Sequence, residues 1–220
     1  MINRVSKEEI QEVTSISISE ITEHDRDEMA IPTYMHQNPL IRWLMWKRYD
    51  CLATMLDINS GAAMEFGCGI GLFLSELDKH YSQVFAIDLY PQYAMKMCEK
   101  KNINVTFLND LSDIEDGTLD VVIAADVLEH IEELDEYLKH FDRILKPGGR
   151  FLISGPTENL LYKLGRLVAG FGDKADYHHT NIYHLLNSIE KFGFKKGTVI
   201  SLPFTMLPSL FKICSFQKVK

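Results

Sequence analysis

Short apolar segments alternate with amphipathic ones from Ala62 onward. The apolar segments have the length of strands and cover residues 62–66, 84–88, 105–108, 120–125 and 150–154. The fourth contains the run Val121-Val122-Ile123, which is typical of a strand buried on both faces. The segments between them, residues 72–80, 93–101 and 132–145, carry apolar side chains at helical spacing. This alternation predicts βαβ units.

The pattern changes around and after the fifth apolar segment. Pro147-Gly148-Gly149 is expected to end the helix over residues 132–145. Residues 158–171 place apolar side chains on one face of an additional helix, and residues 183–192 predict another, closed by Gly193. Residues 195–202 and 211–218 have the pattern of two final strands. We therefore predict an α/β fold with a seven-stranded, mostly parallel sheet and helices on both faces.

Residues 1–60 precede the alternation and have a predominantly helical pattern. The pattern is clearest from Leu40 to Leu56. The first thirty residues are charged and lack a sustained period, so either a fraying arm or a small cap over the site fits them. We predict an N-terminal helical cap or arm over residues 1–60 and a ligand-binding domain over residues 61–220.

Composition narrows the possible partners and the location. The chain has 220 residues, 46% of them hydrophobic, which is enough for one substantial core. Its 31 acidic residues exceed its 23 basic ones, and the net charge of −8 disfavours binding to nucleic acid, which depends on clustered cations. We expect no membrane-spanning segment and no secretory signal, and hence a cytoplasmic protein, because no apolar stretch is long enough for either.

The four cysteines are Cys51, Cys68, Cys98 and Cys214, and no two of them form a CxxC pair. Such spacing argues against a structural zinc site, and a reducing compartment argues against disulfides. We predict no bound metal.

The segment Glu65-Phe66-Gly67-Cys68-Gly69-Ile70-Gly71 stands between the first predicted strand and the first predicted helix. Its glycines allow a ligand to approach backbone N–H groups at a helix N-terminus. Asp88 ends the next predicted strand about 20 residues further on, where a carboxylate can accept hydrogen bonds from both hydroxyls of a ribose. An ordinary tight turn would explain the glycines but not the two acids. The segment therefore predicts a nucleotide-like ligand.

The spacing of the glycines distinguishes between two kinds of such ligand. Dinucleotide sites carry GxGxxG, whereas this loop reads GxGxG and has Leu72 in place of the third glycine of that pattern. Glu65 suits a cationic amino group and is a poor neighbour for a pyrophosphate. We expect a ligand with a ribose and a positive charge and without a diphosphate.

Five motifs in chain order resemble those of the class I S-adenosylmethionine-dependent methyltransferases. The glycine loop resembles motif I, Ala86-Ile87-Asp88 resembles motif II, and Asn109-Asp110-Leu111 is similar to the adenine-contacting turn of the family. Residues 120–131 resemble its fourth-strand motif, and residues 145–150 resemble the turn into its fifth strand. The small-molecule methyltransferases of ubiquinone and menaquinone biosynthesis are nearest in style. The resemblance implies a Rossmann-like sheet and S-adenosylmethionine as cofactor.

The resemblance also implies roles for individual residues at the cofactor. The glycines would line its methionine and ribose part, Glu65 would support the loop or the amino group, and Asp88 would hold the ribose. Asp110 and the Leu111 amide would contact the adenine, although the stretch from Asp110 to Asp120 is short for the family. The implied cofactor-binding residues are Glu65, Gly67, Cys68, Gly69, Gly71, Asp88, Leu89, Asp110, Leu111, Ala125 and Asp126.

Candidate catalytic residues lie in two places. Tyr177, His178 and His179 follow the amphipathic segment, in the region where this family usually meets its acceptor, and histidine suits proton transfer near neutral pH. A solvated loop would explain the same three residues. His130, next to Glu129, could reach the acceptor, or the pair could simply start the helix that follows.

The predicted activity is methyl transfer to a small acceptor by in-line displacement, which needs positioning more than an obligatory base. Residues 158–171 and 202–208 could border an apolar acceptor pocket or touch a membrane surface peripherally. Two alternatives remain: a nicotinamide-dependent oxidoreductase on a Rossmann fold, and a catalytically silent methyltransferase-like binding domain. The identity of the acceptor, the atom methylated and the oligomeric state stay open.

Overall fold

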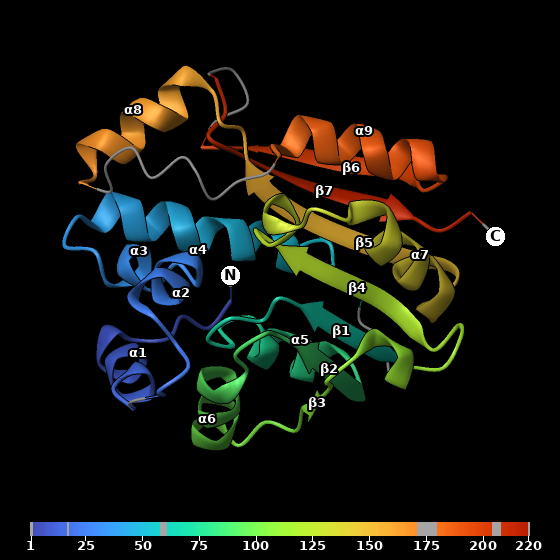
Figure 1. The fold of residues 1–220 in the computed structure, drawn as a ribbon, viewed down its shortest axis with the longest axis horizontal. Helices are drawn as coiled ribbons and strands as arrows, with labels where there is room; N and C mark the ends of the chain where they lie inside the picture. The colour runs from blue at the N-terminus through green and yellow to red at the C-terminus, as the bar shows by residue number, and fades with distance from the viewer. Residues whose placement is uncertain (1, 17, 58–60, 171–179, 204–207, 220) are drawn as a thin grey trace.

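The computed structural model describes residues 2–16, 18–57, 61–170, 180–203 and 208–219. Its strands are β1 (Ala62–Phe66), β2 (Gln83–Ile87), β3 (Thr106–Phe107), β4 (Leu119–Ala125), β5 (Leu145–Pro156), β6 (Lys195–Leu202) and β7 (Phe211–Gln217). They form one seven-stranded sheet in the order β3-β2-β1-β4-β5-β7-β6 (Figure 1). β1 to β5 pair in parallel, and β7 runs antiparallel to β5 and β6. The predicted mostly parallel seven-stranded sheet is confirmed.

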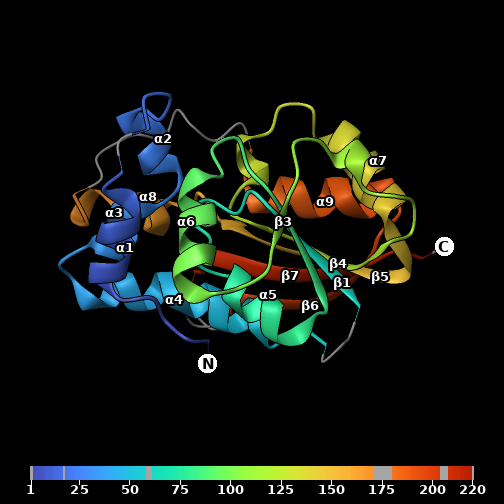
Figure 2. The same cartoon turned by 90° about the horizontal axis from the view of Figure 1, so that it is seen from below.

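Helices cover both faces of this sheet (Figures 1 and 2). They are α1 (Lys7–Thr14), α2 (Glu23–Glu28), α3 (Ile31–Met35), α4 (Pro39–Ala53), α5 (Leu74–His80), α6 (Gln92–Lys101), α7 (Leu134–Ile144), α8 (Leu160–Val168) and α9 (Ile182–Phe192), with 3₁₀ turns η1 (Leu111–Asp113) and η2 (Leu128–His130). Local signals fix several ends: Ser6 and Glu9 form a capping box at α1, and α9 runs from the Asn181 cap to Gly193. No helix in the described part of the chain is long and apolar enough to cross a membrane.

The strands divide the core into two layers because successive side chains point to opposite faces. In β1, Met64 and Phe66 pack with α7 and α9, whereas Ala63 packs with the helices on the other face. In β4, Val122 and Ala124 face the α7 and α9 layer, and Val121 and Ile123 face the opposite one. The same alternation sends Glu65 away from Phe66, toward the layer that holds α4, α5 and α6.

The N-terminal helices share that second layer. Ile10 and Val13 of α1 are buried in the same apolar cluster as Ala63 and Val121 of the sheet. On the surface, α1 lies beside α6, and the Lys100 ammonium is 2.7 Å from the Glu12 carboxylate (Figures 1 and 2). The described N-terminal residues are therefore packed rather than frayed, while the boundary between residues 60 and 61 stays a prediction.

Most predicted boundaries differ from the observed ones by one to three residues, and the largest difference is at the start of β5. We expected residues 132–145 to form a helix that ends at Pro147-Gly148-Gly149, but α7 ends at Ile144 and Leu145 already pairs with Leu119 in the sheet. The register shift before the next pair, Val121 with Arg150, accommodates the residues between as a bulge. The residue before a proline avoids the helical conformation, which explains why the chain becomes extended before Pro147.

Candidate active site

The carboxyl ends of β1, β2 and β4 lie at the same edge of the sheet, where open α/β sheets bind their ligands. The glycine loop leaves β1 there, and Gly67, Gly69 and Gly71 all have positive φ, at 74°, 53° and 75°. A Cβ on Gly67 would lie 2.5 Å from a methyl group of Val127, whereas one on Gly69 would meet nothing closer than Met29 at 4.0 Å. Gly67 therefore serves packing, and Gly69 leaves open space beside the backbone.

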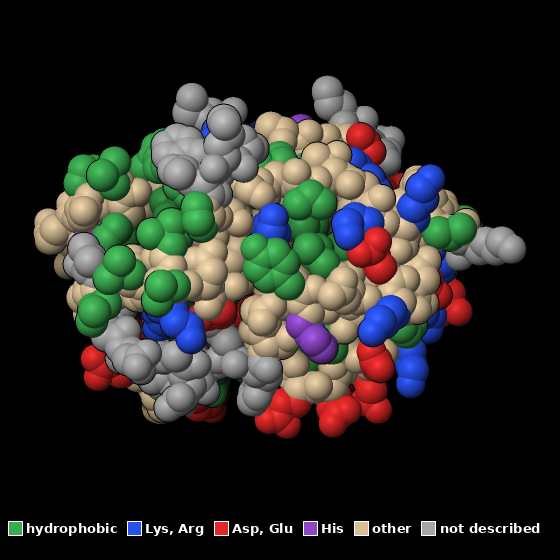
Figure 3. Space-filling view, turned by 90° about the horizontal axis from the view of Figure 1, so that it is seen from above, with side chains coloured by type: hydrophobic (Ala, Val, Ile, Leu, Met, Phe, Trp, Pro, Cys, Tyr) green, Lys and Arg blue, Asp and Glu red, His purple; other side chains and the backbone are tan. Residues whose placement is uncertain are grey.

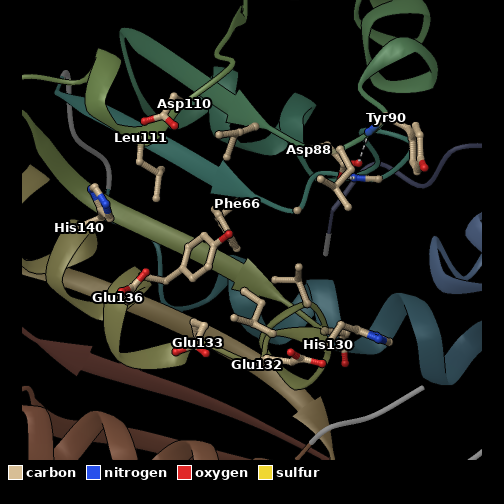
Figure 4. Close-up of a pocket in the computed structure, with 18 of the residues that line it drawn as sticks. Phe66, Asp88, Tyr90, Asp110, Leu111, His130, Glu132, Glu133, Glu136 and His140 are labelled. Carbon is tan, nitrogen blue, oxygen red and sulfur yellow. Dashed lines mark hydrogen bonds between the residues drawn. The ribbon is translucent and has the colours of Figure 1, made fainter. Parts of the chain in front are cut away.

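Asp88 holds this loop in place. Its Oδ2 accepts a hydrogen bond from the Gly69 amide at 2.7 Å, and its Oδ1 accepts one from the Tyr90 amide at 3.0 Å. Figure 4 shows Asp88 and Tyr90 together at one end of a cavity. Because a carboxylate oxygen can accept two hydrogen bonds, both oxygens retain the capacity to bind a diol. Asp88 thus organises the loop as well as standing where the sequence predicts a ribose contact.

The cavity has a volume of about 710 Å³, within the range of small-molecule sites, and is open along the loops that follow β1, β2 and β4. Its described lining contains seven carboxylates and neither lysine nor arginine. Figure 4 shows several of them around the cavity together with His130 and His140. The carboxylates are Asp25, Asp88, Asp110, Asp126, Glu132, Glu133 and Glu136. Such a lining attracts a cation and repels a diphosphate.

The predicted cofactor-binding residues divide into two groups. Those that line the cavity are Gly67, Gly69, Asp88, Leu89, Asp110, Leu111 and Asp126. Glu65, Cys68, Gly71 and Ala125 are not among the lining residues. The Gly71 amide donates to the Cys68 carbonyl at 2.8 Å, and a Cβ on Gly71 would lie 3.1 Å from the backbone of Ala94. Gly71 therefore lets α6 approach the loop.

Asp110 caps the short turn η1. Its Oδ1 accepts a hydrogen bond from the Ser112 amide at 2.7 Å, and the hydrogen bonds from Ser112 lower the pKa of this carboxyl. Asp110 and Leu111 lie together on one side of the cavity, across from His130 (Figure 4). A turn residue and a ligand contact are thus compatible at this position.

Glu65 lies behind the loop and is only 1% exposed. Its Oε2 is buried without a hydrogen-bond partner. Burial, with the nearby charge of Asp88, raises the pKa of Glu65 well above its usual value. The alternation of β1 explains this placement, because it turns Glu65 to the face opposite Phe66. Such surroundings favour the neutral form of this carboxyl over the charged one.

An ion pair joins the N-terminal helices to the end of β4. Asp126 has a positive φ of 56°, and its Oδ2 accepts a hydrogen bond from the Ser154 hydroxyl at 2.7 Å and pairs with the guanidinium of Arg48. Arg48 is buried in α4 and also donates to the Tyr34 hydroxyl at 3.3 Å. Burial opposes the charge of Arg48, but Asp126 and the neighbouring tyrosines outweigh it and raise the pKa of the guanidinium.

A second cavity of about 430 Å³ lies on the other side of this pair. Its walls come from α3, α4, α8 and the start of β7, and most of its lining is apolar, including Leu40, Leu44 and Phe211. His130 and Asp126 line both cavities, so the two share a wall. An apolar pocket that adjoins a polar one suits a second reactant.

Of the predicted catalytic residues, only His130 lies in the part of the chain that the structure describes. His130 stands at the wall shared by both cavities. Tyr177, His178 and His179 lie outside the described residues. Within the described part of the chain, no group of three or more His, Cys, Asp or Glu side chains is arranged to hold a metal ion.

Sequence reasoning missed Arg48, which lines the second cavity. A usable signal existed, because the helical neighbours of Arg48 three and four residues away, Leu44, Met45, Cys51 and Leu52, are all apolar. Its partner could not be inferred, since Asp126 is far away along the chain. Phe66, Tyr90 and Tyr137, which line the first cavity, carried no signal beyond their place next to motifs or on a helix face.

Comparison with known proteins concerns mainly the middle of the chain. Residues 64–153 match the family model described as a methyltransferase domain. The ubiquinone biosynthesis O-methyltransferase of Xanthomonas oryzae pv. oryzae (strain PXO99A) is 28% identical over 114 residues, which are 49% of this chain and 48% of that protein. The chain thus matches about half the length of the curated relatives.

Solved structures share the fold over a longer stretch. The N-methyltransferase NodS from Bradyrhizobium japonicum WM9, in complex with S-adenosyl-L-homocysteine, superposes with a TM-score of 0.65 at 15% identity, over 90% of this chain and 98% of that chain. Phosphoethanolamine N-methyltransferase 2 of Haemonchus contortus, in complex with S-adenosyl-L-methionine, gives a TM-score of 0.61 at 16% identity, over 98% of this chain and 60% of that one. Identities this low show the fold alone.

The buried carboxyl of Glu65 predicts a pH-dependent stability. The pKa of Glu65 is higher in the folded protein than in the unfolded chain, where it is about 4.3. Its contribution to the free energy of unfolding is therefore fully present below about pH 4.3 and is lost as the pH rises through the folded pKa. Glu65→Gln has no carboxyl to ionise and does not show this loss. Between the unfolded and the folded pKa, its free energy of unfolding should rise relative to that of the wild type by up to about 1.4 kcal/mol per pH unit. Urea unfolding at pH 5, 6.5 and 8 measures the gain, with the exposed Glu99→Gln of α6 as control. A stability difference that is constant with pH contradicts this assignment.

The two roles of Asp88 predict different results for two variants. Asp88→Ala removes the acceptors of both the Gly69 and Tyr90 amides and should lower stability by about 1–3 kcal/mol as well as ligand affinity. Asp88→Asn retains one acceptor oxygen and should mainly weaken S-adenosylhomocysteine binding, by roughly 10- to 100-fold in calorimetry. The exposed Asp113→Asn of η1 is the control. Unchanged affinity in both Asp88 variants would make this acid a turn residue only.

Proposed function

We propose that this chain, whose residues 64–153 match a family model described as a methyltransferase domain, is a class I S-adenosylmethionine-dependent methyltransferase that transfers a methyl group from S-adenosylmethionine to a small, largely apolar acceptor. The observation that carries the proposal is the acid-rich cavity around the glycine loop at the carboxyl ends of β1, β2 and β4. A ligand with a sulfonium and an ammonium group matches this lining in charge.

The residues of the first cavity fit the cofactor. Gly69 leaves room beside the backbone, and Asp88 has the acceptor capacity for a ribose diol. Asp110 and Leu111 would hold the adenine, and Asp126 would face the charged end. When bound, S-adenosylmethionine supplies a methyl group activated by its positive sulfur. Glu65 is not among the lining residues, so any effect that it has on the cofactor would be indirect.

The second cavity would hold the acceptor. Its apolar walls from α3, α4 and α8 suit a hydrophobic body, and Asp126 and His130 mark the wall where the acceptor would meet the cofactor. The contribution of these residues is to orient the nucleophile in line and to exclude water, an effect worth several kcal/mol of the barrier. The similarity to ubiquinone biosynthesis O-methyltransferases makes a hydroxyl oxygen the first acceptor atom to test.

The alternatives are less well supported. A nicotinamide dinucleotide would bring its diphosphate into a cavity with seven carboxylates and no cation from lysine or arginine among the described lining residues. A silent binding domain would need the first cavity only, and it leaves unexplained the second cavity that shares a wall with it.

The proposal predicts a specific pattern of ligand stabilisation. S-adenosylmethionine and S-adenosylhomocysteine should each raise the melting temperature, because a ligand at 100 times its Kd adds about 2.7 kcal/mol to the native state. NAD at the same concentration should leave it unchanged. Differential scanning fluorimetry with all three compounds measures this, with adenosine as a control for the shared nucleoside. Stabilisation by NAD, with no response to either sulfur compound, contradicts the proposal.

An exposed apolar surface lies beside the proposed acceptor cavity. Leu160, Leu164 and Leu167 of α8 are 84%, 53% and 63% exposed, and Figure 3 shows hydrophobic side chains gathered on the side where α8 lies. Lys163 and Arg166 are the basic residues of this helix. Amphipathic helices of this kind lie in membrane interfaces, so we extend the proposal to peripheral membrane contact by a cytoplasmic protein.

Membrane contact predicts binding to lipid vesicles. The wild type should sediment with phosphatidylcholine vesicles that contain phosphatidylglycerol, and Leu164→Glu/Leu167→Glu should reduce this binding about tenfold or more, because burying each leucine contributes about 1.5–3 kcal/mol. Met95→Glu replaces an exposed apolar residue on α6 and should bind like the wild type. Equal binding by the α8 variant, or no binding by the wild type, refutes the membrane contact while leaving methyl transfer untouched.

A further inference from the structure

Glu129 is a buried carboxyl that no step described so far uses. It lies in the 3₁₀ turn η2 after β4 and is 1% exposed, yet it lines the second cavity. Its Oε2 is buried and has no hydrogen-bond partner. A buried acceptor without a donor costs about 1–3 kcal/mol, so a donor supplied by a ligand is the simplest explanation for it.

The charges around Glu129 indicate what kind of donor fits. Asp126 acts on it from the end of β4, Arg48 from α4, and Glu158 from the residues before α8. Asp27 and Arg166 lie elsewhere on the lining, and His130 and the Tyr162 of α8 are close neighbours. Arg48 is already paired with Asp126.

These charges nearly balance, which favours a neutral occupant. An ammonium ion in this cavity would have two arginines as neighbours, and a carboxylate would have three acids as neighbours. Like charges disfavour both occupants. An unprotonated alkyl amine is neutral, but it is a minor species at pH 7. A hydroxyl group is neutral, donates one hydrogen bond and retains a lone pair that can attack a methyl group.

We propose that the acceptor of the suggested methyl transfer is an alcohol or phenol on an apolar body, and that its hydroxyl group donates a hydrogen bond to Glu129, which also takes its proton. This inference rests on the proposed function. It assigns the O–H to the unpartnered Oε2 and the apolar body to the walls formed by α3, α4 and α8.

The step balances without any further reactant. The acceptor oxygen forms a bond to the methyl carbon, and the carbon–sulfur bond breaks with its electron pair remaining on sulfur. The O–H proton passes to the Glu129 carboxylate. One positive and one negative charge disappear together, which leaves a methyl ether, a thioether and a neutral carboxyl group.

The surroundings of Glu129 also suit a proton acceptor. Burial, with the charge of Asp126, raises the pKa of Glu129 well above its usual value, while Arg48 acts in the opposite direction. A base with a raised pKa takes a proton more readily than an exposed glutamate does. Because the ionised form is the one that reacts, turnover should rise with pH as Glu129 loses its proton.

Binding of simple probes tests the hydroxyl contact without knowledge of the natural acceptor. Calorimetry on the complex with S-adenosylhomocysteine compares 4-butylphenol, butylbenzene and 4-butylbenzylamine. The phenol should bind tenfold to a hundredfold more tightly than butylbenzene, as expected for a hydrogen bond to a carboxylate. Glu129→Leu should abolish this preference, and the exposed Asp135→Asn of α7 should retain it.

Glu129→Gln separates proton transfer from binding. The amide oxygen still accepts the hydrogen bond, so the variant should retain the preference for the phenol, and it also serves if Glu129→Leu fails to fold. Its single-turnover methylation of 4-butylphenol should fall at least 100-fold and lose the rise with pH, while Glu129→Asp keeps that rise.

The outcomes separate the inference from the function on which it rests. Failure of the wild type to bind S-adenosylhomocysteine overturns the proposed function. If S-adenosylhomocysteine binds, three results overturn only the assignment to Glu129. They are equal affinities for butylbenzene and 4-butylphenol, a higher affinity for 4-butylbenzylamine than for the phenol, and no binding of any of the three compounds. The assignment is equally overturned if Glu129→Leu keeps the phenol preference or Glu129→Gln turns over normally.

Discussion

The ion pair between Arg48 and Asp126 is the contact on which the arrangement of the two cavities depends. It connects α4, in the N-terminal helical region, to the residue that ends β4, and Asp126 lines both cavities. Ser154 and Tyr34 supply further hydrogen bonds to the pair. A buried pair of this kind adds little net stability, but loss of one partner costs about 3–5 kcal/mol. The pair therefore fixes how α4, which also packs against the sheet through its apolar side chains, meets the wall shared by the two cavities.

The two cavities differ in the ligand that each can stabilise. The first is lined by carboxylates and favours a cation, whereas the second is lined mainly by apolar side chains, with its charges nearly balanced. The proposed methyl transfer would use both properties, because its donor is a cation and its acceptor has an apolar body. The acidic lining of the first cavity and the apolar lining of the second meet at the wall that Asp126 and His130 form.

The fold and the type of cofactor domain could be predicted because their signals are local. Strands such as Val121-Val122-Ile123 and the GxGxG loop report their surroundings within a few residues, and residues 64–153 match a family model described as a methyltransferase domain. The pairing of Arg48 with Asp126 could not be predicted, since it joins distant parts of the chain. Nor did motif matching foresee that Glu65 turns away from the cavity, although the alternation along β1 contained that information. The first thirty residues showed no clear period because their apolar positions pack against α6 and the sheet in short helices.

Glu65 and Glu129 both depart from the rule that buried polar atoms are hydrogen-bonded, and both lie near the ligand-binding edge of the sheet. Each is a buried carboxyl with an oxygen that lacks a partner, and in each the pKa is raised by burial first and by a neighbouring aspartate second. In a core selected for stability alone, an apolar side chain of similar size would remove the cost of burying these polar oxygens. Local inconsistencies of this kind concentrate at functional sites, where stability is given up for chemistry. Their positions therefore carry information about function: Glu65 lies next to the glycine loop, and Glu129 lines the second cavity, so the two departures stand beside the proposed cofactor site and the proposed acceptor site.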